Sequence, residues 1–173
     1  TSTSMNDSQW AQMATYYLDS VDNGLYLAIR GITDNWNLHF DDLSYPMYDR
    51  LIDNYILTGV VNPNKVYFLG YSAGGDGVYQ IAARMSERIA AANMSAGHPN
   101  DVSPVNLYKV PFLIQMGELD AAFDRNTVAA DYSKSLRALR KSEPRGYIHE
   151  LFLYHGAGHT GVRDNDPDPK SGS

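Results

Sequence analysis

Apolar residues recur along the chain with two different spacings, and the two alternate from one segment to the next. Consecutive apolar, β-branched or aromatic residues predict five strands, at 25–29, 65–70, 89–95, 110–116 and 148–154. The helical spacing i, i+3, i+4, i+7 predicts helices at 10–18, 48–56, 78–85 and, in looser register, 126–140. Strands that alternate with helices predict an α/β fold, with a mostly parallel sheet flanked by helices on both faces.

The loops that follow the strands of such a sheet gather at one edge, where ligands bind. We therefore expect the loops after residues 29, 70, 95, 116 and 154 to share that edge. A chain of 173 residues fits one domain. We place this domain at 1–162 and expect the polar, proline-rich residues 163–173 to form a flexible tail.

Composition and charge exclude several classes of protein. The net charge is −6 and no basic cluster is present, so we expect no nucleic-acid partner. No apolar run approaches the roughly 20 residues of a membrane helix, so we expect no membrane partner. The chain has no cysteine, which excludes disulfides, thiolate zinc sites and cysteine nucleophiles. We expect a soluble protein, and among the compartments the cytoplasm is slightly favoured.

A serine lies between glycines where the second predicted strand ends, in the sequence Gly70-Tyr71-Ser72-Ala73-Gly74. Strand, Gly-x-Ser-x-Gly and helix together form the nucleophile-elbow pattern, in which a strained turn exposes the serine hydroxyl. The turn is expected to leave no room for a Cβ at either flanking glycine. The alternatives are a structural Gly/Ser-rich turn, a degenerate dinucleotide fingerprint and a phosphate-binding loop, and the last two lack required residues.

The next two glycines, Gly75 and Gly77, are expected only to loosen the first turn of the helix that follows.

A serine hydroxyl is a weak nucleophile unless a base accepts its proton and an acid orients that base. Asp120 follows the fourth predicted strand and is the expected acid, with Glu118 and Asp124 as weaker alternatives. His159 lies in the glycine-rich loop after the fifth strand and is the expected base. The alternative for each residue is a purely structural role in a loop.

Two other histidines precede His159 in this part of the chain. His149 lies inside a predicted strand and His155 at its end, so both are poorer candidates for the base. The spacing of His155 and His159 matches a helical zinc pair, but Gly156 and Gly158 argue against a helix there. We therefore expect no metal and no cofactor.

The motifs GYSAGG, MGELD and GAGH, in this order, resemble those of the α/β-hydrolase superfamily. The resemblance covers residues 25–160 and is to the capless esterase branch, with its carboxylesterases, dienelactone-hydrolase-like and polyhydroxybutyrate-depolymerase-like enzymes. It implies a serine hydrolase that cleaves small carboxylic esters through an acyl-enzyme intermediate. The Ala73 N–H would then be one oxyanion donor. A peptidase, a thioesterase or a noncatalytic binding protein on the same fold are the alternatives.

The resemblance also implies strands that this chain lacks. The five predicted strands match the fourth to eighth of the family sheet, so the N-terminal strands and the second oxyanion donor are expected to be missing. A sheet cut at this point exposes an edge, which a second copy of the chain or the absent segment could cover.

Three residues are candidates for the wall of a substrate pocket. Tyr71 lies beside the serine, and Trp36 and His39 lie in the loop after the first predicted strand. Arg30 or Asp34 of that loop could bind a polar group, although packing of the whole loop over the sheet is the alternative.

Overall fold

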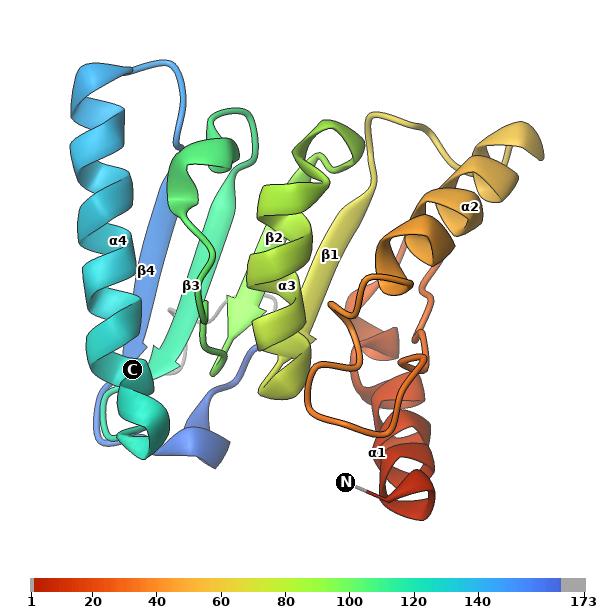
Figure 1. Cartoon of the computed structure of the whole chain (residues 1–173), viewed down its shortest axis with the longest axis horizontal. Helices are drawn as coiled ribbons and strands as arrows, with labels where there is room; N and C mark the ends of the chain where they lie inside the picture. The colour runs from red at the N-terminus through yellow and green to blue at the C-terminus, as the bar shows by residue number, and fades with distance from the viewer. Residues whose placement is uncertain (1, 166–173) are drawn as a thin grey trace.

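The computed structural model describes residues 2–165, which form a four-stranded parallel sheet with helices packed against it (Figure 1). The strands pair in chain order and are β1 (Tyr67–Tyr71), β2 (Ala91–Ser95), β3 (Phe112–Gly117) and β4 (His149–Tyr154). The helices are α1 (Thr3–Tyr16), α2 (Ser44–Leu57), α3 (Ala73–Arg84) and α4 (Arg125–Ser142). Short 3₁₀ turns are η1 (Leu18–Ser20), η2 (Ser86–Arg88), η3 (Pro104–Leu107), η4 (Ala122–Asp124) and η5 (His159–Gly161). The α/β architecture predicted from the alternating pattern is confirmed.

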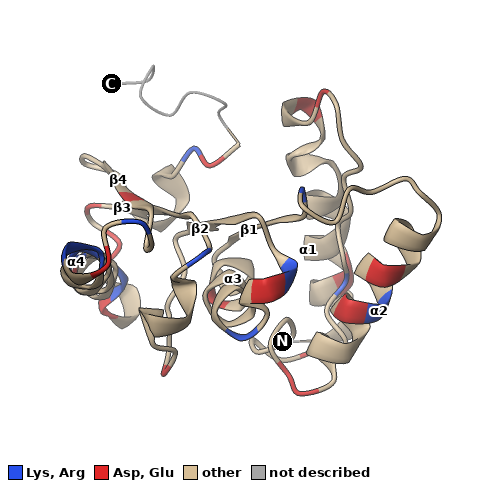
Figure 2. Ribbon diagram, turned by 90° about the horizontal axis from the view of Figure 1, so that it is seen from above, with Lys and Arg blue, Asp and Glu red and all other residues tan. Residues whose placement is uncertain are grey.

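The helices are placed unequally around the sheet. Figure 2 shows α3 and α4 on one side, whereas α1 stands beyond the β1 edge and extends toward the other side. The connection between β2 and β3, residues 96–111, contains only η3, so no cap domain is inserted there.

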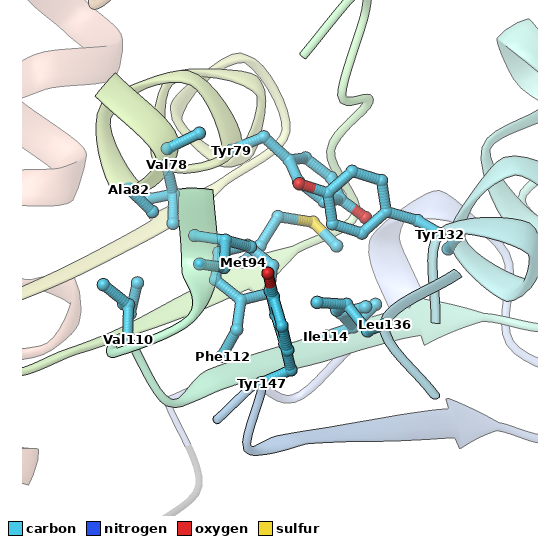
Figure 3. Packing of buried hydrophobic residues seen from close by; sticks show 14 of the residues in the cluster. Val78, Tyr79, Ala82, Met94, Val110, Phe112, Ile114, Tyr132, Leu136 and Tyr147 are labelled. Atoms are coloured by element: carbon cyan, nitrogen blue, oxygen red, sulfur yellow. The ribbon is translucent and has the colours of Figure 1, made fainter. Parts of the chain in front are cut away.

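The main core lies between the sheet and the helices α3 and α4 (Figure 3). Tyr79 of α3 packs against Phe112 of β3, with ring centroids 5.4 Å apart, and against Tyr132 of α4, at 4.7 Å. Met94 and Ile114 are fully buried beneath them. Because α3 directly follows Ser72, this packing fixes the start of α3 relative to the sheet.

The prediction of a strand at 25–29 is wrong, because this segment forms no ladder with any described strand. Its polar groups are used by α1 instead: the Trp10 indole donates to the Ala28 carbonyl at 2.8 Å, and the Tyr26 hydroxyl donates to the Met13 carbonyl at 2.5 Å. A strand needs backbone partners, whereas here the one backbone group bonded to α1 is the Ala28 carbonyl, which accepts from a side chain, and the Tyr26 bond uses no backbone group of the segment.

The expected flexible tail begins at residue 163, but Asp164 is only 7% exposed and makes hydrogen bonds to α1. The rest of that tail, 166–173, lies outside the described residues.

β1 is an edge strand, and on it Tyr67 and Leu69 are 59% and 40% exposed. A dimer through this edge stays a prediction. In residues 2–165, none of the helices has the length and apolar character of a membrane span.

Candidate active site

Three loops converge at the carboxyl edge of the sheet, and each carries one of the predicted polar residues. Ser72 follows β1, Asp120 follows β3 and His159 opens η5 after β4. The Ser72 Oγ lies 2.9 Å from His159 Nε2, and His159 Nδ1 lies 2.7 Å from Asp120 Oδ2. The structure thus joins a hydroxyl, an imidazole and a carboxylate in one hydrogen-bonded line.

The turn that carries Ser72 is strained, with φ 56° and ψ −119° at the serine. A left-handed φ costs a residue with a Cβ of the order of 1–3 kcal/mol, so neighbouring contacts must hold it. One contact is the bond from the Ser72 N–H to the Ser95 carbonyl, at 2.9 Å. Another is the close approach at Gly70, where a Cβ would lie 2.4 Å from the Gly74 carbonyl oxygen.

The predicted roles of the neighbouring glycines need correction. A Cβ at Gly74 would meet no atom within 4 Å, so Gly74 supplies the crowded backbone but is not itself confined. Gly75, expected only to add slack, is required sterically because its Cβ would lie 2.5 Å from the Ser95 carbonyl oxygen. Gly77 is likewise confined, by the side chain of His39 at 2.6 Å. The helix packs against β2 and its loop more closely than the spacing indicated.

The loops that carry Asp120 and His159 are fastened to each other. The Leu119 N–H donates to the Ala157 carbonyl at 2.8 Å, and the Gly156 N–H donates to Glu118 Oε2 at 2.9 Å. A Cβ at Gly117 would lie 2.5 Å from the Gly158 carbonyl oxygen, so the two backbones touch. This contact explains how side chains 39 positions apart in the chain come to lie at bonding distance.

Asp120 is almost completely buried, with 2% of its surface exposed, whereas the His159 side chain is 33% exposed. The Asp120 Oδ1 has no hydrogen-bond partner among the described residues. Because burial without hydrogen bonds is costly for a carboxylate, the bond from the His159 imidazole to the second oxygen, Oδ2, is important for the stability of Asp120 in this position. The imidazole in turn presents Nε2 to Ser72 at the accessible side of the site.

Tyr71 contacts the histidine rather than only lining a pocket. Its hydroxyl donates to the His159 carbonyl, and the two ring centroids are 5.5 Å apart. Burial raises the pKa of the Tyr71 hydroxyl, which therefore remains a donor at neutral pH. The sequence suggested Tyr71 as a neighbour of Ser72, but not this bond across 88 positions.

The other predicted lining residues are placed differently. Trp36 is 55% exposed. His39 is half-buried between α2 and α3: its Nδ1 lies 2.9 Å from the Tyr48 hydroxyl, and burial lowers its pKa to about 4. Contact of either side chain with a substrate stays a prediction.

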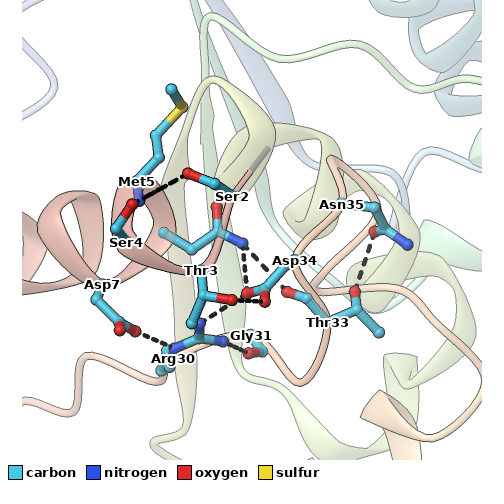
Figure 4. Close-up of polar contacts among 11 residues, drawn as sticks. Ser2, Thr3, Ser4, Met5, Asp7, Arg30, Gly31, Thr33, Asp34 and Asn35 are labelled. Carbon is cyan, nitrogen blue, oxygen red and sulfur yellow. Dashed lines mark hydrogen bonds and ion pairs between the residues drawn. The ribbon is translucent and has the colours of Figure 1, made fainter.

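Arg30 and Asp34 serve to dock α1 (Figure 4). Arg30 bonds to Asp34 at 2.7 Å and to Asp7 at 2.6 Å. Asp34 also accepts from Thr3 at 2.5 Å and from Asn6 at 3.0 Å, and these bonds lower its pKa to about 2. These contacts therefore support a packing role for Arg30 and Asp34 rather than the binding of a polar group of a substrate.

The rival acids and histidines lie outside the hydrogen-bonded line. Glu118 binds the backbone of Gly156, and Asp124 is exposed in the left-handed region, with φ 55°. The His155 side chain is 84% exposed, and its nearest charged partner is Glu118 at 3.5 Å. His149 Nδ1 lies 2.8 Å from the Tyr147 carbonyl.

The N-terminus of α3 faces this site. Ala73 is its first residue, so its N–H has no partner within the helix. Asp76, in the same first turn, was not singled out from the sequence; it accepts from the His98 N–H at 2.7 Å, and burial raises its pKa. An acid four residues after Ser72 was the available signal.

Comparisons with known proteins identify a family and a fold for the chain. The family model described as the dienelactone hydrolase family matches residues 43–172. Among curated proteins, none matches the chain. Solved structures with a similar fold include LpqC, a poly(3-hydroxybutyrate) depolymerase from Bordetella parapertussis (18% identity, TM-score 0.51, 71% of this chain and 55% of that one). A thermostable esterase is also similar (18% identity, TM-score 0.53, 72% of this chain and 31% of that one). SOBER1 from Arabidopsis thaliana is 20% identical, with TM-score 0.49, over 68% of this chain and 55% of that one.

The chain spans little more than half the length of LpqC and SOBER1. The likeness to LpqC and to the thermostable esterase, at 18% identity, concerns the fold. The family match covers most of the chain, including the segments that carry Ser72, Asp120 and His159. The α/β-hydrolase resemblance is thereby confirmed, and the chain belongs to the dienelactone hydrolase family.

Proposed function

We propose that the protein is a serine hydrolase that cleaves a small carboxylic ester through an acyl-enzyme intermediate. The observation that carries the proposal is the hydrogen-bonded line from Ser72 Oγ to His159 Nε2 at 2.9 Å and from His159 Nδ1 to Asp120 Oδ2 at 2.7 Å. A positioned base and its orienting acid are what a serine needs to become nucleophilic at neutral pH.

In the first half of the reaction, Ser72 Oγ attacks the ester carbonyl carbon while His159 Nε2 accepts the hydroxyl proton. The tetrahedral oxyanion forms near the start of α3, where the Ala73 N–H donates to it. The alcohol leaves with the proton from His159, and Ser72 remains acylated. Asp120 holds the imidazole orientation and stabilises the imidazolium.

In the second half, His159 removes a proton from water, which attacks the acyl carbon. The carboxylic acid is released when the proton returns to Ser72 Oγ. Atoms balance with water as the sole co-substrate, and the reaction uses no cofactor.

The test compares matched histidine variants in the same loop. His159→Gln should lower hydrolysis of p-nitrophenyl acetate by at least about 10⁴-fold, whereas His155→Gln, at a side chain that is 84% exposed, should leave it unchanged. A fluorophosphonate probe should label wild type at Ser72, and Ser72→Ala should abolish labelling while the exposed Ser142→Ala retains it. Folded wild type that neither hydrolyses esters nor takes the probe would indicate a noncatalytic binding protein.

A further inference from the structure

A buried carboxylate lies just beyond the predicted base and has no role in the proposed reaction. Asp164 is five positions after His159 and only 7% exposed. Its Oδ2 accepts a hydrogen bond from the Tyr17 hydroxyl, and its Oδ1 accepts one from the Tyr16 hydroxyl at 3.2 Å. No lysine, arginine or histidine of residues 2–165 forms an ion pair with it.

Burial raises the pKa of the Asp164 carboxyl, although the hydroxyls of Tyr17, Ser95 and Tyr16 act in the opposite direction. Desolvating a carboxylate without a cation is unfavourable, and the hydrogen bonds from the Tyr16 and Tyr17 hydroxyls compensate part of that cost. Both come from the end of α1 or directly after it, more than 140 positions away in the chain. The next residue is held as well, because the Ser20 hydroxyl donates to the Asn165 carbonyl at 2.8 Å.

The segment that carries His159 is thus held from both ends. Before the histidine, Gly156 and Ala157 are bonded to the loop after β3. After it, Val162 is buried and Asp164 is bound to Tyr16 of α1 and to Tyr17, which directly follows that helix. Between these anchors, the Tyr71 hydroxyl holds the His159 carbonyl.

The remaining polar contacts of α1 are with residues 26–34. Its first turns bind Arg30 and Asp34, Trp10 binds Ala28, and the Met13 carbonyl binds Tyr26. Within residues 2–165, the side chains of Tyr16, Tyr17 and Ser20 connect this N-terminal part of the chain to residues 164 and 165.

We propose that Asp164, clamped by Tyr16 and Tyr17, is a positioning residue for His159, and that α1 is therefore a supporting element of the active site. The proposal rests on the proposed function for its effect on catalysis, but its structural consequence can be measured without activity. Misplacing a reacting group by about 1 Å can cost roughly 10²-fold in rate, so a loose anchor should be visible in kcat.

The experiment uses Asp164→Ala, Asp164→Asn and Tyr17→Phe in the full chain, with Asp19→Asn at an exposed position of η1 as the matched control. The activity-independent readout is the low-field proton signal of the His159 Nδ1–H bonded to Asp120, assigned by its loss in His159→Gln. Amide hydrogen exchange of residues 156–162 is measured alongside it. Thermal unfolding establishes that each variant is folded.

Asp164→Ala should broaden or abolish the low-field signal and increase exchange across 156–162 by at least about 10-fold. On p-nitrophenyl acetate, kcat should fall by about 10- to 100-fold while KM changes by less than about 3-fold. Asp164→Asn, which can still accept the Tyr17 hydroxyl, should restore part of both readouts, and Tyr17→Phe should lie between them. Asp19→Asn should resemble wild type.

A folded Asp164→Ala variant with an unchanged low-field signal and unchanged exchange at 156–162 would overturn the positioning role. If Asp164→Ala does not fold, the same two readouts on Tyr17→Phe decide, because that change removes a single hydroxyl. Should wild type lack esterase activity, the signal and the exchange data still test the clamp, so failure of the proposed function is distinguishable.

Discussion

The hydroxyl of Tyr71 donates a hydrogen bond to the carbonyl oxygen of His159, so the residue beside the serine holds the backbone of the histidine. The side-chain bond from Ser72 to His159 then runs alongside a second link between the same two loops. Two parallel links restrict the relative movement of the loops more than either link alone. The geometry of the site therefore depends on a residue that the sequence suggested only as a pocket wall.

Tyr71→Phe is predicted to lower kcat for p-nitrophenyl acetate by about 5- to 10-fold. The phenyl ring keeps any wall that the tyrosine provides, so KM should stay within about 2-fold, whereas the lost hydrogen bond is worth about 1 kcal/mol. Steady-state kinetics measure both constants. Tyr67→Phe, at a 59% exposed tyrosine of the same strand, is the control and should change neither. An altered KM with normal kcat would instead assign Tyr71 to substrate contact.

The two glycines that flank the serine are predicted to respond oppositely to alanine. Gly70→Ala places a Cβ 2.4 Å from the Gly74 carbonyl oxygen and should lower the free energy of unfolding by about 1–3 kcal/mol. Gly74→Ala places its Cβ in open space within the first turn of α3 and should raise that free energy by up to about 1 kcal/mol. Urea unfolding followed by circular dichroism measures both. Equal destabilisation by the two variants would contradict this account of the turn.

Much of the fold was predictable because each of the four observed strands is short, mostly apolar and followed by a glycine-rich or polar loop. The residues Ser72, Asp120 and His159 could be selected since parallel strands bring their following loops to one edge. The sequence could not reveal the fastening of Gly117 against Gly158, or the contact of Gly75 with Ser95, because both depend on the distance between neighbouring strands and loops.

Two other features were missed for different reasons. The segment 25–29 has the composition of a strand, but strand formation depends on a partner, which local pattern does not contain. Asp164 lies in a polar, proline-rich stretch whose composition is typical of a flexible tail. It is held in place by hydrogen bonds from Tyr16 and Tyr17, which lie near the other end of the chain. In both cases α1 supplies the decisive contacts, and a helix position relative to a distant segment leaves no local signal.

Asp120→Asn is predicted to lower kcat for p-nitrophenyl acetate by about 10⁴-fold with little change in folding. The amide can keep the buried site filled, but it favours the wrong tautomer of His159 and cannot stabilise the imidazolium. Asp124→Asn is the matched control, because Asp124 is exposed in the same loop and asparagine tolerates its left-handed backbone. An Asp120→Asn variant with near-normal activity would show that another acid, such as Glu118, orients the histidine.

His39 is predicted to make stability depend on pH between about 6.5 and 4. Burial lowers its pKa to about 4 from 6.5, so in this window the unfolded chain binds the proton more tightly than the folded one. Stability contributed by neutral His39 is therefore fully present above pH 6.5 and is lost as pH falls through 4. A shift of this size corresponds to about 3 kcal/mol.

Raised pKa values at Asp76 and Asp164 act with the opposite sign, since their protonated forms favour the folded state, so wild type alone does not isolate His39. The measurement is the difference in urea unfolding free energy between wild type and His39→Gln at pH 7 and pH 4. Glutamine retains an acceptor for the Tyr48 hydroxyl and does not titrate. Between pH 7 and pH 4, the unfolding free energy of wild type should fall by about 3 kcal/mol relative to that of His39→Gln. If the difference between the two proteins does not depend on pH, His39 is already solvated in the folded protein.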